Sequence, residues 1–246
     1  MALRIGFNPQ DRFMVWLLNP DVLTVIKNSG DVFGARFEND VLQPVFQFTG
    51  AKIGFNTQDR FMVSLPSGIA DFLVVIKNDG SVFGAEVLSA PDILPVFQFT
   101  GARVGFNTQD RFIVALGNTL VVIKDDGSVF GADVDLIQHF ISPVFQFTVA
   151  RIGFNPQDRF MVALGKTLVV ITDDGSVFGA DVDLTGRNIQ PVFQFTGARI
   201  GFNTIDRFMV VRGSELLVIT ADGNVFGANT DTVNRNIEPP VFQVNA

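Results

Sequence analysis

One short string occurs five times along the chain, and this repetition constrains the fold more than any other feature. The string Ile-Gly-Phe-Asn-x-Gln-Asp-Arg-Phe begins at positions 5, 53, 104, 152 and 200, with Val replacing Ile in the third copy and Ile replacing Gln in the fifth. Successive copies start 48, 51, 48 and 48 residues apart. Periods of this size are typical of solenoids and propellers, in which each repeat covers the apolar face of its neighbour.

Each repeat predicts β-strands and not helices. In the fourth copy, stretches rich in Val, Ile and Phe cover residues 152–154, 160–164, 168–171, 177–182 and 192–195. None is long enough or has the periodicity of a helix. The connections suit tight turns because they contain Pro, Gly, Asn and Asp. We therefore expect a four-stranded antiparallel meander, with residues 192–195 forming either its outer strand or the link to the next repeat.

Five repeats of this size predict an all-β fold, a five-bladed β-propeller of four-stranded antiparallel blades. We expect one domain over residues 1–246, with repeats at about 4–51, 52–102, 103–150, 151–198 and 199–246. The first repeat lacks a preceding Pro-Val-Phe-Gln, whereas the chain ends with a surplus copy at 240–243. The last segment is therefore expected to complete the first blade, so that pairing of the N- and C-terminal segments closes the ring.

The blade layout resembles that of tectonin-type and tachylectin-2-like propellers, and the latter are a five-bladed lectin family. The resemblance rests on Pro-Val-Phe-Gln-Phe-Thr-Gly at 191–197, the alternating strand at 199–202 and Arg-Phe-Met-Val at 207–210, and it recurs along the whole chain. It is a resemblance of layout, and it implies carbohydrate binding without assigning that role to any residue here.

Composition narrows the classes of partner. The net charge is −7 and the pI is near 4.6, so the surface should repel the phosphates of nucleic acids. No apolar run is long enough to cross a bilayer, and the first repeat begins at once, which predicts no membrane insertion and a cytoplasmic or non-classically secreted protein. The chain has 27 Phe, one Trp and no Tyr, so most aromatic rings are expected in the core.

Three polar positions never vary among the five copies, and they are the candidate ligand-binding residues. They are Asn8, Asp11, Arg12, Asn56, Asp59, Arg60, Asn107, Asp110, Arg111, Asn155, Asp158, Arg159, Asn203, Asp206 and Arg207. In one interpretation, Asn caps a turn while Asp and Arg lock adjacent blades through ion pairs or backbone hydrogen bonds. In the other, they form five equivalent sites for a hydroxyl-rich or carboxylate ligand. The invariant Gln of Val-Phe-Gln should face solvent or fill a polar slot between blades.

Catalytic and metal chemistry has little support in the sequence. There is no Cys, and the only His, His139, lies in a variable segment without a repeated partner. We expect no catalytic residue, no cofactor and no metal ion. The Asp-Asp-Gly-Ser segments suggest calcium, but the paired acids are lost in the first and fifth copies, which favours plain hairpin turns. Arg-Asn-Ile recurs at 187–189 and 235–237, either as two related polar patches or through drift.

These features lead to three functional hypotheses. The first is a non-enzymatic recognition module, a multivalent lectin-like protein that binds carbohydrate through equivalent sites and gains avidity from their number. The second is a structural or protein-interaction scaffold, and the third is an enzyme with a single site in the axial tunnel. The expected partners are glycans or proteins, and the sequence leaves the oligomeric state open.

Overall fold

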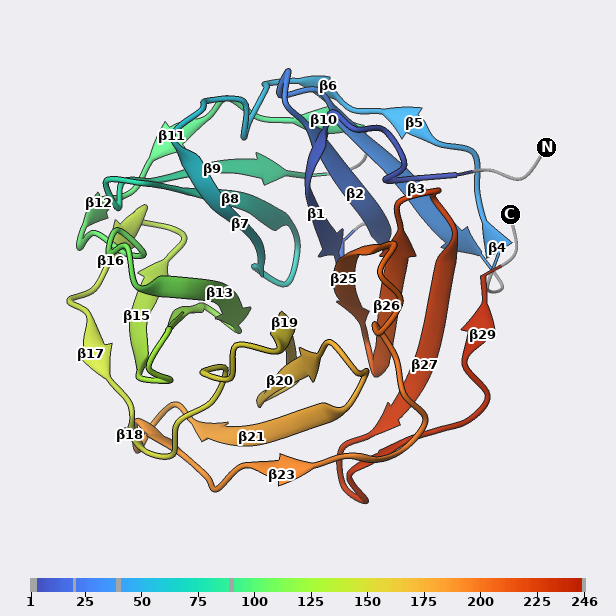
Figure 1. Cartoon of the computed structure of the whole chain (residues 1–246). Coiled ribbons are helices and arrows are strands. Elements are labelled where there is room, and N and C mark those ends of the chain that lie inside the picture. The colour runs from blue at the N-terminus through green and yellow to red at the C-terminus, as the bar shows by residue number, and fades with distance from the viewer. Residues whose placement is uncertain (1–3, 20, 39–40, 89–90, 245–246) are drawn as a thin grey trace.

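The computed structural model describes residues 4–19, 21–38, 41–88 and 91–244, and every regular element within them is a β-strand. The strands form five small, mainly antiparallel sheets arranged in a ring (Figure 1). This arrangement is the five-bladed β-propeller that the repeats predict. Within the described ranges, no helix is long and apolar enough to span a bilayer.

Three long antiparallel strands form the body of each blade. The innermost strands are β1 (Asp11–Leu17), β7 (Asp59–Pro66), β13 (Asp110–Leu116), β19 (Asp158–Leu164) and β25 (Asp206–Arg212). The second strands are β2 (Val22–Lys27), β8 (Asp71–Lys77), β14 (Thr119–Lys124), β20 (Thr167–Thr172) and β26 (Glu215–Thr220). The third strands are β3 (Val32–Glu38), β9 (Val82–Val87), β15 (Val129–Asp135), β21 (Val177–Asp183) and β27 (Val225–Asp231). In the fourth blade, the turns at residues 165–166 and 173–174 are the hairpin turns that the Gly-containing connections predict.

The outer edge of each blade is divided into two-residue segments. The first set, which pairs with the end of the third strand, is β4 (Val41–Leu42), β10 (Asp92–Ile93), β16 (Phe140–Ile141), β22 (Asn188–Ile189) and β28 (Asn236–Ile237). The second set, from Val-Phe-Gln, pairs with the start of the same third strand and is β5 (Phe46–Gln47), β11 (Phe97–Gln98), β17 (Phe145–Gln146), β23 (Phe193–Gln194) and β29 (Phe242–Gln243). The expected fourth strand is therefore real but broken, and Val-Phe-Gln belongs to it.

A third kind of short segment joins successive blades. These segments are β6 (Thr49–Gly50), β12 (Thr100–Gly101), β18 (Thr148–Val149) and β24 (Thr196–Gly197), and each pairs in parallel with the outer edge of the next blade. Each repeat thus extends the sheet of its neighbour before it forms its own innermost strand.

The expectation that residues 240–243 complete the first blade is wrong. β29 pairs with β27, so this segment completes the fifth blade (Figure 1). The ring closes within the described chain through side chains, since Val244 is buried in one cluster with Ile5 and Trp16.

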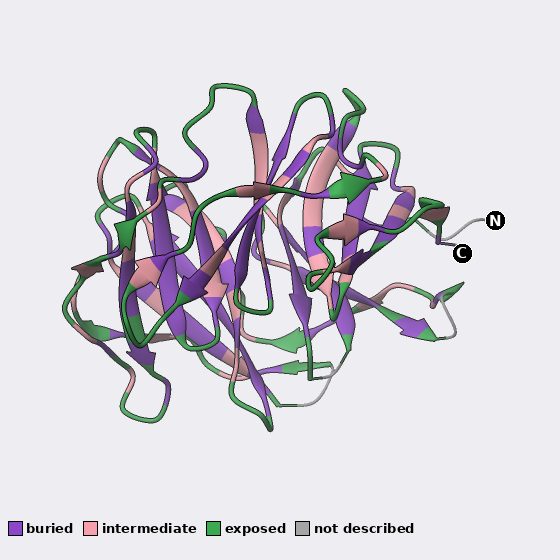
Figure 2. Cartoon of the chain, turned by 90° about the horizontal axis from the view of Figure 1, so that it is seen from below, coloured by how far each residue is buried: buried purple, intermediate pink, exposed green. Residues whose placement is uncertain are grey.

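The core is divided among the spaces between adjacent blades. One cluster, for example, contains Val15 and Leu17 of the first blade together with Leu73 and Val75 of the second. Second strands are covered on both faces and are buried almost throughout, which explains why they read as uninterrupted apolar runs. Figure 2 shows buried residues along the strands of the interior and exposed residues in the peripheral loops. Each blade is therefore stabilised mainly by its two neighbours.

Candidate functional site

The invariant Asn and Asp build the turn that leads into each innermost strand. In the fourth blade, the Asn155 backbone N–H donates to Asp158 Oδ2 at 2.8 Å, and the Gln157 N–H donates to Asn155 Oδ1 at 3.1 Å. The Asp158 N–H also donates to the Asn155 carbonyl at 2.9 Å. The other four copies repeat this pattern. The turn-capping role predicted for Asn is confirmed, whereas the Asp carboxylate, which was expected to help lock adjacent blades, accepts a hydrogen bond within its own turn.

The invariant Arg follows the Asp at a bulge in the innermost strand. The register shifts between Asp and Phe in all five blades, for instance between Asp110 and Phe112, which leaves Arg111 as the extra residue. A bulge changes the direction of a side chain relative to the regular strand. The guanidinium of Arg111 donates to the carbonyls of Asn155 at 2.7 Å and Asp158 at 2.5 Å in the next blade.

The five Arg bridges form a closed circle. Arg12, Arg60, Arg111, Arg159 and Arg207 each donate to the Asn and Asp carbonyls of the following blade, and Arg207 reaches Asn8 and Asp11 of the first. Backbone hydrogen bonds, which are one of the two inter-blade contacts expected, hold the blades together. Ligand binding at these fifteen residues stays a prediction.

The Asp carboxyl groups of these turns are buried beneath the Arg bridges. Burial is the main cause that raises the pKa of Asp11, Asp158 and Asp206, against the lowering effect of the backbone N–H bond that each accepts. Asp11 and Asp59 each have a second carboxyl oxygen that is buried without a hydrogen-bond partner. Raised pKa values can mark functional groups, but here the cause is the packing of one blade on the next.

The axial channel is the hollow to which every blade contributes. It has a volume of about 400 Å³. Its wall consists of three consecutive residues from each innermost strand, such as Met161, Val162 and Ala163, together with residues of the hairpin that follows. In the first blade, Trp16 takes the position that Ala163 has in the fourth.

Two kinds of surface line this channel. The side chains are mainly Met, Val, Ala and Ile, and none of the described lining residues ionises. The innermost strands each pair with one neighbour only, so their other edges face the axis with unpaired backbone N–H and C=O groups (Figure 1). Ser64 extends this polar edge, since its hydroxyl donates to the Trp16 carbonyl at 2.7 Å. The wall therefore offers apolar contact and backbone hydrogen bonds, without charge.

Several positions differ from what the sequence predicts. The invariant Phe of Gly-Phe-Asn is not in the core: Phe7, Phe55, Phe106, Phe154 and Phe202 are 52 to 57% exposed. The invariant Gln residues are exposed, which is one of the two placements expected. The backbone carbonyls of His139, Arg187 and Arg235 accept equivalent hydrogen bonds on three blades, so the two Arg-Asn-Ile segments occupy equivalent places. Their role as two related polar patches stays a prediction. Alignment of the variable segments on their final Ile would have revealed this equivalence.

Comparison with known proteins supports the fold but assigns no family. No protein-family model matches the chain, and no curated protein shows significant sequence similarity. Among solved structures, a luciferin-regenerating enzyme is 9% identical, with a TM-score of 0.50, over 99% of this chain and 80% of that one. A Bacteroides uniformis protein provisionally named a 6-phosphogluconolactonase is 14% identical, with a TM-score of 0.47, over 91% of this chain and 69% of its own. Human WBSCR16 is 12% identical, with a TM-score of 0.42, and the chain covers 65% of its length.

These findings correct the functional hypothesis drawn from the repeats. The multivalent lectin-like recognition module is contradicted, because the solved structure that shares this fold with a TM-score of 0.50 is named as an enzyme. The geometry agrees with the correction, since the Arg side chains that were to bind ligands are engaged by neighbouring backbone. The resemblance to tachylectin-2 and tectonin blades holds for the propeller layout alone.

Proposed function

We propose that this propeller acts on a small, mainly apolar organic molecule, with the axial channel as its substrate-binding site. The observation that carries the proposal is the channel itself, an uncharged hollow of about 400 Å³ to which all five blades contribute. Sites for small molecules are usually concave, mainly apolar and between about 300 and 1,000 Å³ in volume. The channel has these properties, and the name of the luciferin-regenerating enzyme supports testing a small-molecule reaction first.

The chemistry that the wall can assist follows from its polar groups. Unpaired backbone N–H groups on the innermost strands are fixed hydrogen-bond donors in an apolar surrounding. Donors of this kind stabilise negative charge that develops on a carbonyl oxygen, and their effect is larger where water is excluded. The reaction class we propose is therefore hydrolysis of an uncharged ester or lactone, with the acyl portion held by the Met and Val side chains. Water adds to the carbonyl carbon, the bond from that carbon to the alkoxy oxygen breaks, and a proton of the water passes to the leaving oxygen to give the hydroxy acid.

Trp16 provides a direct test, because it is the only tryptophan and it lines the channel. Titration with δ-decalactone should change its fluorescence in a saturable manner, and mass spectrometry should detect formation of the hydroxy acid above the uncatalysed rate. Ala163→Phe, which narrows the channel, should weaken binding about tenfold or more. Gln194→Phe adds the same ring on the exposed outer strand and should change neither measurement.

Two results would overturn this proposal. The channel is not the binding site if the Trp16 response does not saturate or is the same in Ala163→Phe. The enzymatic part fails if the lactone binds in the channel but no hydroxy acid forms.

A further inference from the structure

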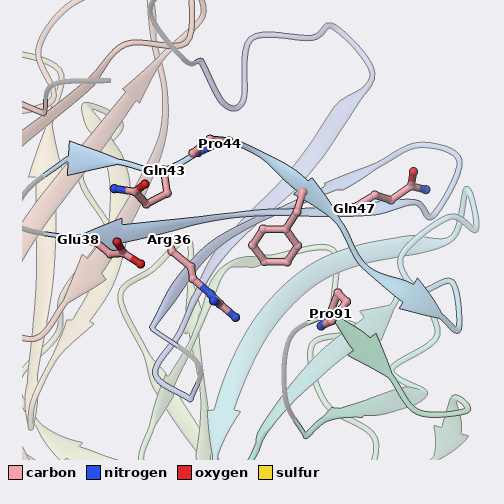
Figure 3. Close-up of a pocket in the computed structure, with 7 residues that line it drawn as sticks. Arg36, Glu38, Gln43, Pro44, Gln47 and Pro91 are labelled. Atoms are coloured by element: carbon pink, nitrogen blue, oxygen red, sulfur yellow. The ribbon is translucent and has the colours of Figure 1, made fainter.

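The outer rim contains a hollow between the first and second blades that the fivefold repeat does not predict. Its volume is about 380 Å³, and its wall includes Arg36, Glu38, Gln43, Pro44, Phe46 and Pro91 (Figure 3). We call it the rim slot. It is distinct from the axial channel, whose lining residues come from the innermost strands and the hairpins after them.

The equivalent place on three other blades is filled by a flat side chain from the next blade. The His139 ring stacks on Phe97 with centroids 3.6 Å apart and planes inclined by 13°. The guanidinium carbon of Arg187 lies 4.0 Å from the centroid of Phe145, and that of Arg235 lies 3.9 Å from the centroid of Phe193. The fold thus places a planar, delocalised group on the face of the Val-Phe-Gln phenyl ring.

Pro91 occupies the corresponding backbone position beside the rim slot. Its carbonyl accepts a hydrogen bond from the Thr49 N–H, as the carbonyl of Arg187 does from Thr148. A pyrrolidine ring has no planar delocalised group to lay on Phe46. The guanidinium carbon of Arg36 is 5.8 Å from the Phe46 centroid, well beyond the 4.0 Å or less of the filled slots. The space in which His139 and its equivalents lie is therefore retained as a cavity.

The charge at this slot also differs from that in the other blades, where the equivalent residue is acidic in three and neutral in one. Strand pairing places Arg36 in register with Glu86, Asp133, Asp181 and Asn229 of the other blades. Asp133 and Asp181 accept hydrogen bonds from neighbouring Thr hydroxyls, whereas the side chain of Arg36 has no hydrogen bond or ion pair with a described residue. In Figure 3 its side chain points into the space between Glu38 and Pro91.

We propose that the rim slot binds a small aromatic monocarboxylate. The aromatic ring takes the place of His139 and its equivalents on the face of Phe46, where offset stacking is favourable. The carboxylate pairs with the planar fork of Arg36, which can donate two parallel hydrogen bonds. Glu38 disfavours a second negative charge on the ligand, while Gln43 and Gln47 offer amide groups to its polar substituents.

Binding of benzoate, monitored by saturation-transfer NMR, tests the proposal. Benzoate should bind saturably at millimolar concentrations, and cyclohexanecarboxylate, which has the same charge but no flat ring, should bind about threefold more weakly or worse. Arg36→Gln should weaken benzoate binding about tenfold, because it removes a charge-assisted pair, and Arg36→Lys should weaken it less. Benzamidine, a planar cation, should not compete.

A filled slot provides the matched control. Arg187→Ala uncovers Phe145 beside Asp181, so this variant should gain a site for benzamidine and none for benzoate. The proposal is overturned if Arg36→Gln leaves benzoate binding unchanged, if cyclohexanecarboxylate binds as well as benzoate, or if no saturable binding occurs. Ala163→Phe should have no effect on benzoate, which separates this site from the channel.

Discussion

At the residue scale, identical polar side chains in every repeat mark the places where the blades touch. Arg111 donates to carbonyls of the following blade, and a bulge before Phe112 directs it there. Because each blade meets the next in the same way, each must present the same donor and the same acceptors. Residues that are invariant among the copies therefore mark the interface between blades, and their invariance does not by itself identify a ligand-binding site.

Asp71 is a buried acid that the repeat does not share. It follows the longer hairpin of the second blade, and one of its oxygens accepts hydrogen bonds from the backbone N–H groups of Leu18 and Asn19 in the first blade. The residue is 1% exposed, and its second oxygen is buried without a partner. Burial is the main cause that raises the pKa of Asp71, and the two N–H donors lower it in part.

The raised pKa of Asp71 predicts a pH-dependent contribution to stability. The folded state holds this proton more tightly than the unfolded state, so the contribution is most favourable below the unfolded pKa and is lost as pH rises through the folded value. Relative to wild type, Asp71→Asn should therefore gain stability as pH increases from 4 to 7. Urea unfolding at several pH values measures this difference, and a difference that does not vary with pH would contradict it.

Asp174 supplies a control, because its contribution to stability should depend on pH in the opposite direction. This exposed carboxyl accepts hydrogen bonds from Thr172 and Ser176, which lower its pKa to about 2. Its stabilising effect is present above the unfolded pKa and is lost as pH falls toward the folded value. Asp174→Asn should therefore lose stability relative to wild type as pH rises from about 2 to about 4, and change little above that.

At the element scale, the segments that join the blades require one unusual backbone conformation. The second residue of β6, β12 and β24 is Gly with φ between 91° and 95°, and a Cβ at Gly50 would lie 2.2 Å from the Ile93 carbonyl oxygen. In β18 this position is Val149, with φ of 83°. The following hydrogen bond, from Ala150 N–H to the Ile189 carbonyl, is 3.3 Å, against 3.0 Å in the other three joints.

We expect Val149→Gly to stabilise the protein by about 1 kcal/mol. A β-branched residue is strained at positive φ, and relief of that strain should exceed the entropic cost of glycine. The side chain is largely exposed, so little packing is lost. Chemical denaturation measures the change. Val192→Gly, at an exposed position with no positive φ, should destabilise; loss of stability in Val149→Gly would show that the strain is negligible.

The elements differ in how much of them could be predicted from sequence. The Asn155 turn and the Gly175 hairpin could be, because their chemistry depends on residues adjacent in the chain. The Ile-Gly-Phe segment could not: it is apolar like a strand, but in the structure it is an irregular loop in which Ile152 is buried and Phe154 is exposed. That outcome depends on contact with the preceding blade, which a local pattern does not contain.

At the scale of the whole molecule, the five blades meet at five interfaces, which we call seams. At four seams the chain runs directly from one blade into the next, and at the seam between the fifth and first blades it does not. The period of the repeat was enough to predict the ring, but the hollows depend on side chains that break the symmetry. Trp16 in the channel and Arg36 in the rim slot each stand where the other blades have a different residue, and comparison of the repeats shows this replacement but not the hollow beside it. Closure of the ring requires a seam between the fifth and first blades. Side chains such as Arg207 and Val244 hold this seam together.

The final prediction compares the seam without a covalent connection with one that has it. Arg207→Gln and Arg111→Gln remove the same bridge, so each should lower the free energy of unfolding by about 2 kcal/mol. Only the first weakens a seam that can open without breaking the chain. An opened ring exposes the apolar faces of two blades, which can pair with a second opened ring.

Light scattering and hydrogen exchange distinguish the two variants. Arg207→Gln should form larger species than wild type as concentration rises, and the amides of β1 and β25 should exchange faster. Arg111→Gln should keep the wild-type mass at matched stability, because residues 146–157 continue to connect its two blades. Equal masses and equal exchange in the two variants would mean that chain continuity contributes little to holding the blades together, and that closure depends on contacts distributed evenly around the ring.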